Sequence, residues 1–482
     1  MVDRLQSVGS AALARGGRIN FAGFLLRLMA RFPFLLIAAR LYGAEDLGRF
    51  AYATMVVEFT AQLATLGLKR GVAAEMARGD RPQTHALADA LLLALGLAIA
   101  GAGLLLLFPV LMFPDGAVAP GERWLALIVP AIVLSEITLA GLAFRHRIGV
   151  AVRARSIIEP WVLTLCATAL AFTAWKSSGL LLAFALSLVA AAVASVWPAV
   201  ATFGVPHGWR PRPRLLWAMA ARNLPLAGAD MVEWAMRRLD IFILGRFSSA
   251  EVVGLYFVAQ QVATLAGKIR TSFDPILAPM LSTALKGGNR LEAASHVRQV
   301  GFWVLAFQIP VVLALGLPGE GVMGLFGPAF AAAATIMALL LTAELAAANS
   351  SISEMGLIYA RPRANLLIAV GGLVLQAALS LALVPRFAGE GAAAALLLSL
   401  VVVAIARQWV LGRALGAPVG FWRWSLLGAG AVAFAFGAAA RALPELSQML
   451  LTIPGVALLF GIILWRWGFG PEDRALFARR RS

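Results

Sequence analysis

Long runs of apolar residues without any charge constrain this chain more than any other feature of its sequence. Residues 91–107 and 391–405 contain no Asp, Glu, Lys or Arg. A helix needs about twenty apolar residues to cross the hydrocarbon core of a bilayer. Over the whole chain 61% of the residues are hydrophobic and only 13% are charged. The sequence therefore predicts an all-α membrane protein without a soluble catalytic domain.

Hydrophobic runs between charged residues, Pro and Gly predict about fourteen membrane-spanning helices. No cleavable signal peptide is expected, because the first run is long enough to span and to act as its own insertion signal. Two runs, 85–113 and 329–359, are long enough that their helices must tilt or protrude. The expected spans are 20–41, 47–68, 85–113, 123–144, 156–175, 179–203, 217–244, 251–271, 299–318, 329–359, 364–385, 390–411, 421–441 and 448–467.

The distribution of Lys and Arg predicts how these helices are oriented. Of the 41 basic residues, 30 lie in one set of alternate connecting segments, which includes both ends of the chain, and 7 lie in the other set. Loops rich in Lys and Arg stay in the cytoplasm. We therefore expect a multi-pass protein of the bacterial inner membrane with both termini cytoplasmic. The net charge of +17 then reflects orientation, and the scattered basic residues form no nucleic-acid-binding module.

A short sequence occurs twice with a constant offset of 206 residues. Segment 40–50 (RLYGAEDLGRF) joins the first two predicted helices, and segment 246–256 (RFSSAEVVGLY) joins the seventh and eighth. Because the copies lie six helices apart, they have the same orientation and predict parallel repeats with substrate between them. We expect an N-terminal lobe of six helices at 1–205, a C-terminal lobe of six at 206–415, and two extra helices with a cytoplasmic tail at 416–482.

Arginines within predicted helices are the first candidate site residues, because a charge in the bilayer core is costly unless it faces a cavity or a partner. Arg27 and Arg31 share one face of the first helix with Asn20, and the repeat offset places Arg237 of the seventh helix at the position of Arg31. Arginine stays charged and grips phosphate oxygens through two parallel hydrogen bonds. We expect these four residues to bind a diphosphate group.

Other polar residues within the helices are candidates for a cavity lining or for ion coupling. They are Asp230, Glu233 and Asp240 on the seventh helix, Glu58 and Gln62 on the second, and Glu344, Asn349 and Glu354 on the tenth. An ion pair between Arg237 and Glu233 is an alternative to phosphate binding. For Arg27 and Arg31 the alternative is extension to the cytoplasmic interface. The carboxylates of the tenth helix are as compatible with helix-to-helix hydrogen bonds as with cation binding.

Sequence motifs for catalysis, metal binding or cofactor binding are missing. The chain has no Walker A sequence and no cluster of Cys and His residues, and its single cysteine, Cys166, lies within an apolar helix. Its outward loops are short, whereas membrane glycosyltransferases and polymerases usually carry charged residues on substantial outward loops. We therefore expect a protein that is not an enzyme and that needs neither a metal nor a cofactor.

Several segments resemble a family of polysaccharide transporters. Segment 40–50 resembles the family's Arg-x-x-Gly-x-x-x-x-Gly turn, and segment 240–245 (DIFILG) followed by 254–259 (GLYFVA) resembles the opening of its second lobe. Segments 275–279 (PILAP) and 325–330 (LFGPAF) resemble further landmarks. On these segments the chain is similar to the Wzx-type O-antigen and exopolysaccharide flippases of the multidrug/oligosaccharidyl-lipid/polysaccharide (MOP) superfamily.

The resemblance implies a two-lobed, V-shaped bundle that acts by alternating access on undecaprenyl-diphosphate-linked oligosaccharide among membrane lipids. Related flippases have cationic cavities, and Arg27, Arg31 and Arg237 occupy comparable helices. Polysaccharide polymerase or assembly proteins are candidate partners.

Three alternative functions differ in what they require. A MATE-like drug or cation exporter would have more acidic residues than arginines in its cavity. A membrane glycan polymerase or ligase would need functional residues on outward loops. A scaffold without transport activity would tolerate loss of the charges within helices.

Overall fold

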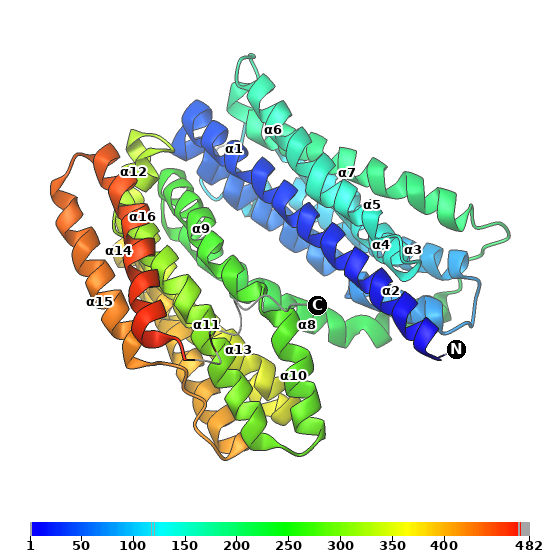
Figure 1. Cartoon of the computed structure of the whole chain (residues 1–482). Coiled ribbons are helices and arrows are strands. Elements are labelled where there is room, and N and C mark those ends of the chain that lie inside the picture. Colours follow the sequence, from blue (N-terminus) through cyan, green and yellow to red (C-terminus); the bar gives the residue numbers. More distant parts are fainter. Residues whose placement is uncertain (1, 117, 120, 471–472, 474–482) are drawn as a thin grey trace. The chain divides into compact units, whose positions relative to one another are not determined.

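The apolar runs of the sequence fold into helices, and every regular element in the described part of the chain is helical. The computed structural model describes residues 2–116, 118–119, 121–470 and 473, with side chains described from residue 32 onward except at 274–276. The chain forms two compact units, shown together in Figure 1. Unit 1 is Met1–Arg238 with Ser249–Glu251, and unit 2 is Leu239–Ser248 with Val252–Ser482.

The helices follow each other along the chain with short connections. Unit 1 contains α1 (Val2–Ala64), α2 (Leu68–Ala77), α3 (Gln83–Leu107), α4 (Val129–Phe144), α5 (Ile148–Val152), the π-helical turn η3 (Arg153–Ile158), α6 (Glu159–Leu170), α7 (Gly179–Phe203) and most of α8 (Pro213–Phe247). Unit 2 contains the end of α8, then α9 (Ala250–Thr271), α10 (Asp274–Lys286), α11 (Arg290–Gly316), α12 (Gly319–Gly324), α13 (Ala334–Ala360), α14 (Pro362–Leu415), α15 (Trp424–Ala439) and α16 (Glu445–Ile463).

Fourteen long helical segments result, because two of the helices are pairs. Among the described residues, nine helices are long and apolar enough to cross a membrane. One of these, α14, is two spans that meet at Ala388, where the backbone has φ 46° and ψ −122°. α1 is likewise two helices joined at Gly43, with φ 85°. Together with the interrupted segment α5–α6 and the more polar α8, they confirm the predicted count of 14. The predicted division into lobes ending at 205 and 415 stays a prediction.

Three elements differ from the predicted pattern. α3 ends at Leu107 rather than near 113, because Pro109 starts a separate 3₁₀ turn and cannot continue the hydrogen bonding of the helix. The fifth span begins at Ile148, before the predicted residue 156, and passes through the π-helical turn η3. The amphipathic helix α10 occupies the connecting segment between the predicted spans 251–271 and 299–318.

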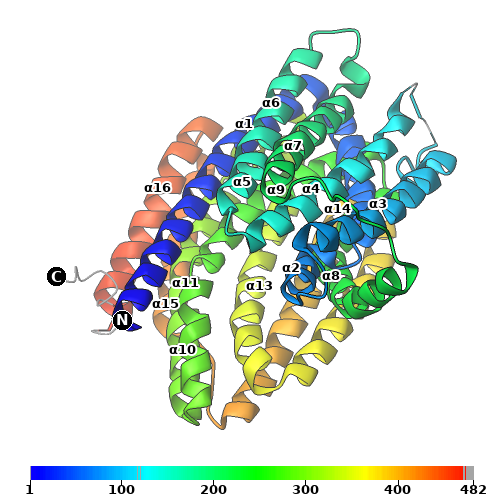
Figure 2. The same ribbon diagram turned by 90° about the vertical axis from the view of Figure 1, so that its right-hand side faces the viewer.

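The turn inside α1 is fixed against two other helices of unit 1. The hydroxyl of Tyr42 donates a 2.6 Å hydrogen bond to the carbonyl of Ala167 in α6. Gly179 at the start of α7 leaves room for this ring, since a Cβ there would lie 2.6 Å from the Tyr42 hydroxyl oxygen. Figures 1 and 2 both show α1 running alongside α6 and α7.

Glycines allow α2 to approach α8 within unit 1. Gly67 precedes α2 with φ 72°, and a Cβ there would lie 2.6 Å from the backbone nitrogen of Ala227. A Cβ at Gly71 would lie 1.6 Å from Oδ1 of Asn223. Arg222 of α8 then donates two hydrogen bonds to Glu75 of α2, from Nε at 2.9 Å and from Nη2 at 2.6 Å. Backbone contact and ion pairing therefore join the two helices that carry the candidate site.

Gly67→Ala is expected to destabilise the protein more than Gly79→Ala. Both glycines have left-handed φ angles, 72° and 75°, so both substitutions meet the same backbone strain of about 1–2 kcal/mol. Only at Gly67 would the new methyl group also meet backbone atoms, which adds about 1–3 kcal/mol. Thermal unfolding of the purified protein in detergent checks this, and equal losses for the two variants would contradict the close approach of α2 and α8.

The core of unit 2 lies among α10, α11, α13, α14, α15 and α16. Asp473, which follows α16 in the chain and is 2% exposed, contacts α11 and the residue before α15. Arg423 and the indole nitrogen of Trp303 donate hydrogen bonds to its carboxylate at 2.7 and 2.8 Å. Burial opposes ionisation of this carboxyl, but the hydrogen bonds from Arg423, the backbone of Gly470 and Trp303 outweigh it and lower the pKa of Asp473.

Large apolar side chains cover the outside of the spans. Leu107, Leu165, Leu367 and Val374 are between 63% and 76% exposed. The apolar window of the α16 span is only 17% buried within the protein. Such extensive exposed apolar surface is rare on soluble monomers. It is the surface that lipid tails cover in a multi-pass membrane protein.

Candidate functional site

A buried carboxylate of α8 lies at the centre of an ionic cluster in unit 1. Asp230 is 3% exposed, and Nε of Arg70 from α2 lies 2.9 Å from its Oδ1. Nζ of Lys69 lies 3.7 Å from the other carboxylate oxygen, Oδ2. Neither contact has the geometry of a hydrogen bond. The buried charge of Asp230 is therefore compensated by ion pairing with the two cations. Because an uncompensated buried charge is very costly, Asp230 holds the start of α2 against α8.

Glu233, which lies about one helical turn beyond Asp230, links two guanidinium groups. Nη2 of Arg70 donates a 2.7 Å hydrogen bond to Oε2 of Glu233, and Nη2 of Arg237 donates a 2.9 Å hydrogen bond to Oε1. The side chains of Arg70, Glu233 and Arg237 are 50%, 49% and 71% exposed. We call Arg70, Glu233 and Arg237 the Arg–Glu–Arg triad. At these exposures, the guanidinium donors that do not contact Asp230 or Glu233 are accessible to a ligand.

Two residues of α1, Glu58 and Gln62, contact cations next to the triad. Nη2 of Arg238 lies 3.8 Å from Oε2 of Glu58, and Lys69 donates a 2.9 Å hydrogen bond to Oε1 of Gln62. The whole cluster contains more cations than carboxylates. The cations are Lys69, Arg70, Arg237 and Arg238, and the carboxylates are Glu58, Asp230 and Glu233. The structure thus places the candidates Asp230, Glu233 and Arg237 of one helix in an ionic cluster with Arg70. It connects the candidates Glu58 and Gln62 of another helix to this cluster through Arg238 and Lys69.

Arg237 is the only described member of the predicted diphosphate-binding set. Asn20, Arg27 and Arg31 lie outside the residues whose side chains the structure describes, although the backbone of α1 is helical there. For Arg237, the predicted alternative of an ion pair with Glu233 is observed. At 71% exposure its guanidinium group nevertheless keeps donors available for a ligand.

Asp240, the remaining acidic residue of α8, has a different environment in unit 2. It is 1% exposed, and its Oδ2 accepts hydrogen bonds from the hydroxyl of Tyr256 at 2.6 Å and from Nε2 of Gln260 at 2.8 Å. Its Oδ1 accepts a hydrogen bond from the backbone of Ile241 at 2.9 Å. These side-chain partners come from α9, whereas those of Asp230 and Glu233 come from α2.

A buried arginine, which sequence reasoning missed, lies in unit 2. Arg407 of α14 is 3% exposed, and its Nη1 donates 2.8 Å hydrogen bonds to Glu354 and to the hydroxyl of Ser350, both in α13. Nε of Arg407 is buried without a hydrogen-bond partner. The predicted cavity residue Glu354 therefore belongs to an ion pair that joins α13 to α14.

The other two candidates of α13 pack within unit 2. The carboxylate of Glu344 contacts α9, because a Cβ added at Gly267 would lie 2.3 Å from its Oε2. Gln308 of α11 donates a 3.0 Å hydrogen bond to the backbone carbonyl of Glu344. Oδ1 of Asn349 is buried without a hydrogen-bond partner. α13 is thus polar mainly where it meets α9, α11 and α14.

Arg155 forms a further ion cluster in unit 1. It lies in the π-helical turn η3, donates a 2.7 Å hydrogen bond to Glu159 of α6, and pairs with Glu136 of α4. π-Helical turns occur frequently at functional sites. Here the turn directs one guanidinium group between two carboxylates and so joins α4 to α6.

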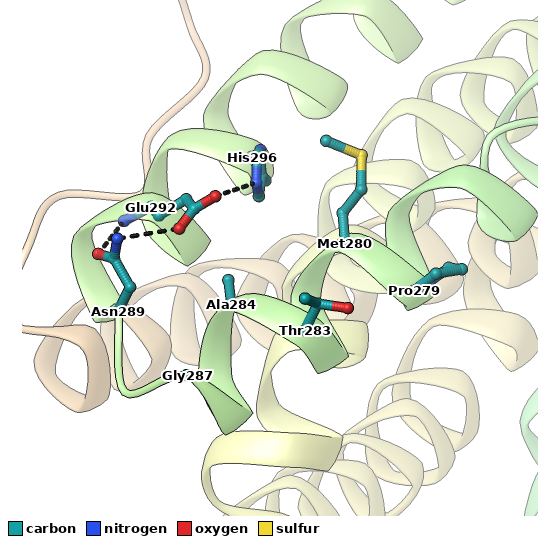
Figure 3. Close-up of a pocket in the computed structure, with 8 residues that line it drawn as sticks. All are labelled: Pro279, Met280, Thr283, Ala284, Gly287, Asn289, Glu292 and His296. Atoms are coloured by element: carbon teal, nitrogen blue, oxygen red, sulfur yellow. Dashed lines mark hydrogen bonds and ion pairs between the residues drawn. The ribbon is translucent and has the colours of Figure 1, made fainter.

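A pocket of about 620 Å³ lies between α10 and α11, and none of the candidates named above lines it (Figure 3). Its polar residues complete the cap of α11: Asn289 accepts a hydrogen bond from the backbone of Glu292 and donates one to its carboxylate. His296 lies 3.5 Å from the same carboxylate. No group of three or more Cys, His, Asp or Glu residues able to hold a metal occurs in the described part of the chain.

Comparison with known families gives one match that covers more than half of the chain. The model of a family described as "Polysaccharide biosynthesis protein" matches residues 37–316. No curated protein matches the sequence.

Solved structures show what fold this chain resembles. Lipid II flippase MurJ, in an inward closed conformation, aligns with a TM-score of 0.76 at 13% identity, covering 93% of this chain and 98% of that chain. An inward-facing multidrug resistance MATE family transporter of the MOP superfamily has a TM-score of 0.65 at 14% identity, covering 81% and 94%. A MOP superfamily transporter from Pyrococcus furiosus has a TM-score of 0.56 at 15% identity, covering 84% and 95%. The fold is therefore that of MOP transporters.

Proposed function

Because the chain belongs to the polysaccharide biosynthesis protein family of Wzx-type flippases, we propose that it moves undecaprenyl-diphosphate-linked oligosaccharide across the bacterial inner membrane by alternating access. The glycan would serve O-antigen or exopolysaccharide synthesis. Family and fold are those of flippases and transporters, and the chain is a multi-pass membrane protein. Its substrate, its membrane and its cytoplasmic termini are parts of the proposal.

The observation that supports this substrate is the excess of cations around the Arg–Glu–Arg triad. Arg70 and Arg237 keep exposed guanidinium groups beside α8, a helix expected to span the membrane. A planar guanidinium group binds phosphate oxygens through paired, charge-assisted hydrogen bonds. Charges on a membrane-spanning helix face a cavity or a partner rather than lipid. A phosphorylated lipid carrier satisfies this cluster better than a cationic drug would.

In the proposed cycle, each part of the substrate meets a suitable surface. The diphosphate binds to Arg237, with Arg27 and Arg31 as the predicted additional ligands, while the oligosaccharide occupies polar space and the polyprenyl chain stays in lipid. An interior-negative membrane potential favours outward movement of an anion by about 2.3 kcal/mol per charge per 100 mV. Asp230, Glu233, Asp240, Glu58, Gln62, Glu344, Asn349 and Glu354 remain candidates for lining the path or for coupling to a cation. Polymerase or assembly proteins that receive the glycan are proposed partners.

Deletion of the gene in its bacterial host tests this function. We expect undecaprenyl-diphosphate-linked repeat units to accumulate, with their sugars accessible only from the cytoplasmic side in inverted membrane vesicles. Accumulation of single units on the periplasmic side would indicate a polymerase or ligase instead. Increased drug sensitivity without accumulation would indicate a multidrug exporter. Full complementation by variants that lack the charges of the cluster would indicate a scaffold.

A further inference from the structure

The Arg–Glu–Arg triad holds a carboxylate in the position that an anionic ligand would take. Glu233 accepts one hydrogen bond from Arg70 at 2.7 Å and one from Arg237 at 2.9 Å, each to a different oxygen. A phosphate group offers the same two acceptors with more charge. Both guanidinium groups approach the carboxylate through Nη2.

We propose that Glu233 competes with the diphosphate of the substrate for Arg70 and Arg237. The incoming diphosphate displaces Glu233 and binds to the two arginines. The inference rests on the proposed function and adds Arg70, which sequence reasoning assigned to a loop, to the diphosphate site. It also assigns Glu233 a role distinct from ion coupling. The exchange requires no proton transfer and no covalent step, because one anion replaces another at the same donors.

The two carboxylates that contact Arg70 differ in how exposed they are. Glu233 is 49% exposed, so an incoming anion can reach its hydrogen-bonding partners. The side chain of Asp230 is 1% exposed and pairs with Nε of Arg70 at 2.9 Å. Asp230 therefore keeps Arg70 in place while Nη2 changes partner. An arginine anchored at one nitrogen and free at another is preorganised for a second ligand.

Glu233 also compensates positive charge when no substrate is bound. After release of substrate and without Glu233, Arg237 would lose its acidic partner and Arg70 would keep only Asp230, which is unfavourable for charges within a membrane protein. Glu233 compensates both charges at once. It also joins α2 to α8, so its displacement removes one connection between these helices. The Glu75–Arg222 pair and the glycine contacts of α2 do not involve the triad.

Binding of inorganic diphosphate to the purified full-length protein tests the inference. Wild type, Glu233→Gln and Glu75→Gln would be compared in phosphatidylcholine nanodiscs by isothermal titration calorimetry. Glu75→Gln is the matched control, because it removes a carboxylate from the same α2–α8 contact without freeing Arg70 or Arg237. We expect Glu233→Gln to bind diphosphate about tenfold more tightly, which corresponds to about 1.4 kcal/mol. We expect Glu75→Gln to bind as wild type does.

Adding Arg237→Gln to Glu233→Gln should abolish the gain in diphosphate affinity. Unchanged or weaker diphosphate binding by Glu233→Gln would overturn the inference, and so would an equal gain in Glu75→Gln. Should Glu233→Gln fail to fold, Glu233→Met removes the same charge with a different side chain, and the same outcomes apply. The gene-deletion test remains independent. Glycan accumulation with no effect of Glu233→Gln would overturn only the inference, whereas tighter diphosphate binding without glycan accumulation would overturn only the proposed function.

Discussion

Arg237→Glu is expected to reduce export of the lipid-linked glycan by at least about tenfold. Arg237 presents a guanidinium group that is 71% exposed and bound on one side by Glu233. A hydrogen bond between charged partners contributes about 1.5–3 kcal/mol, which corresponds to roughly 10- to 100-fold in binding. The substituted carboxylate would also repel both Glu233 and an incoming diphosphate. Complementation of the deletion strain, with quantified surface glycan, measures the loss.

Arg246→Glu is the matched control, because it makes the same charge change at the exposed end of the same helix. We expect it to export glycan as wild type does at equal protein abundance. Arg237→Lys should give an intermediate rate, since an ammonium group lacks the planar fork that binds two phosphate oxygens. Wild-type export by Arg237→Glu, or equal losses at positions 237 and 246, would exclude Arg237 from the substrate site.

The fold could be predicted from the sequence because its determinants are local. A spanning helix needs an apolar run, and its orientation depends on the nearby Lys and Arg residues. The charged residues Asp230, Glu233 and Arg237 could also be found, since each interrupts an apolar helix. Their partners could not be identified in this way, because Arg70 lies 163 residues from Glu233 along the chain. Which arginine of the predicted connecting segments contacts α8 depends on tertiary packing.

Two sequence signals for the missed residues can now be recognised. Gly67 and Gly71 have the Gly-x-x-x-Gly spacing that lets helices approach closely, and Lys69 and Arg70 lie between them. The distribution of Lys and Arg groups Arg407 with the basic segment 407–423, although it lies inside the predicted span 390–411. Its burial against α13 could not be derived from charge distribution, which treats every basic residue near a helix end as solvated.

Glu354→Gln is expected to destabilise unit 2 by about 3 kcal/mol, because it leaves the guanidinium group of Arg407 buried without a counter-charge. Arg407 is 3% exposed, and after the substitution its guanidinium group would face only neutral acceptors, the amide oxygen at position 354 and the hydroxyl of Ser350. The expected loss lies at the lower end of the usual range for a broken buried ion pair, because the Glu354 side chain is 37% exposed and is partly solvated already. Reversible unfolding of the purified protein in detergent measures the free-energy change.

The double variant Glu354→Gln with Arg407→Met distinguishes the cost of a lone charge from the value of the pair. An apolar side chain of similar length at 407 removes the buried cation, so the double variant should recover most of the stability that Glu354→Gln loses. Glu390→Gln, at an exposed position of the same α14, should change stability by no more than about 0.5 kcal/mol. A double variant less stable than Glu354→Gln alone would mean that Arg407 stabilises unit 2 through packing rather than through its pairing with Glu354.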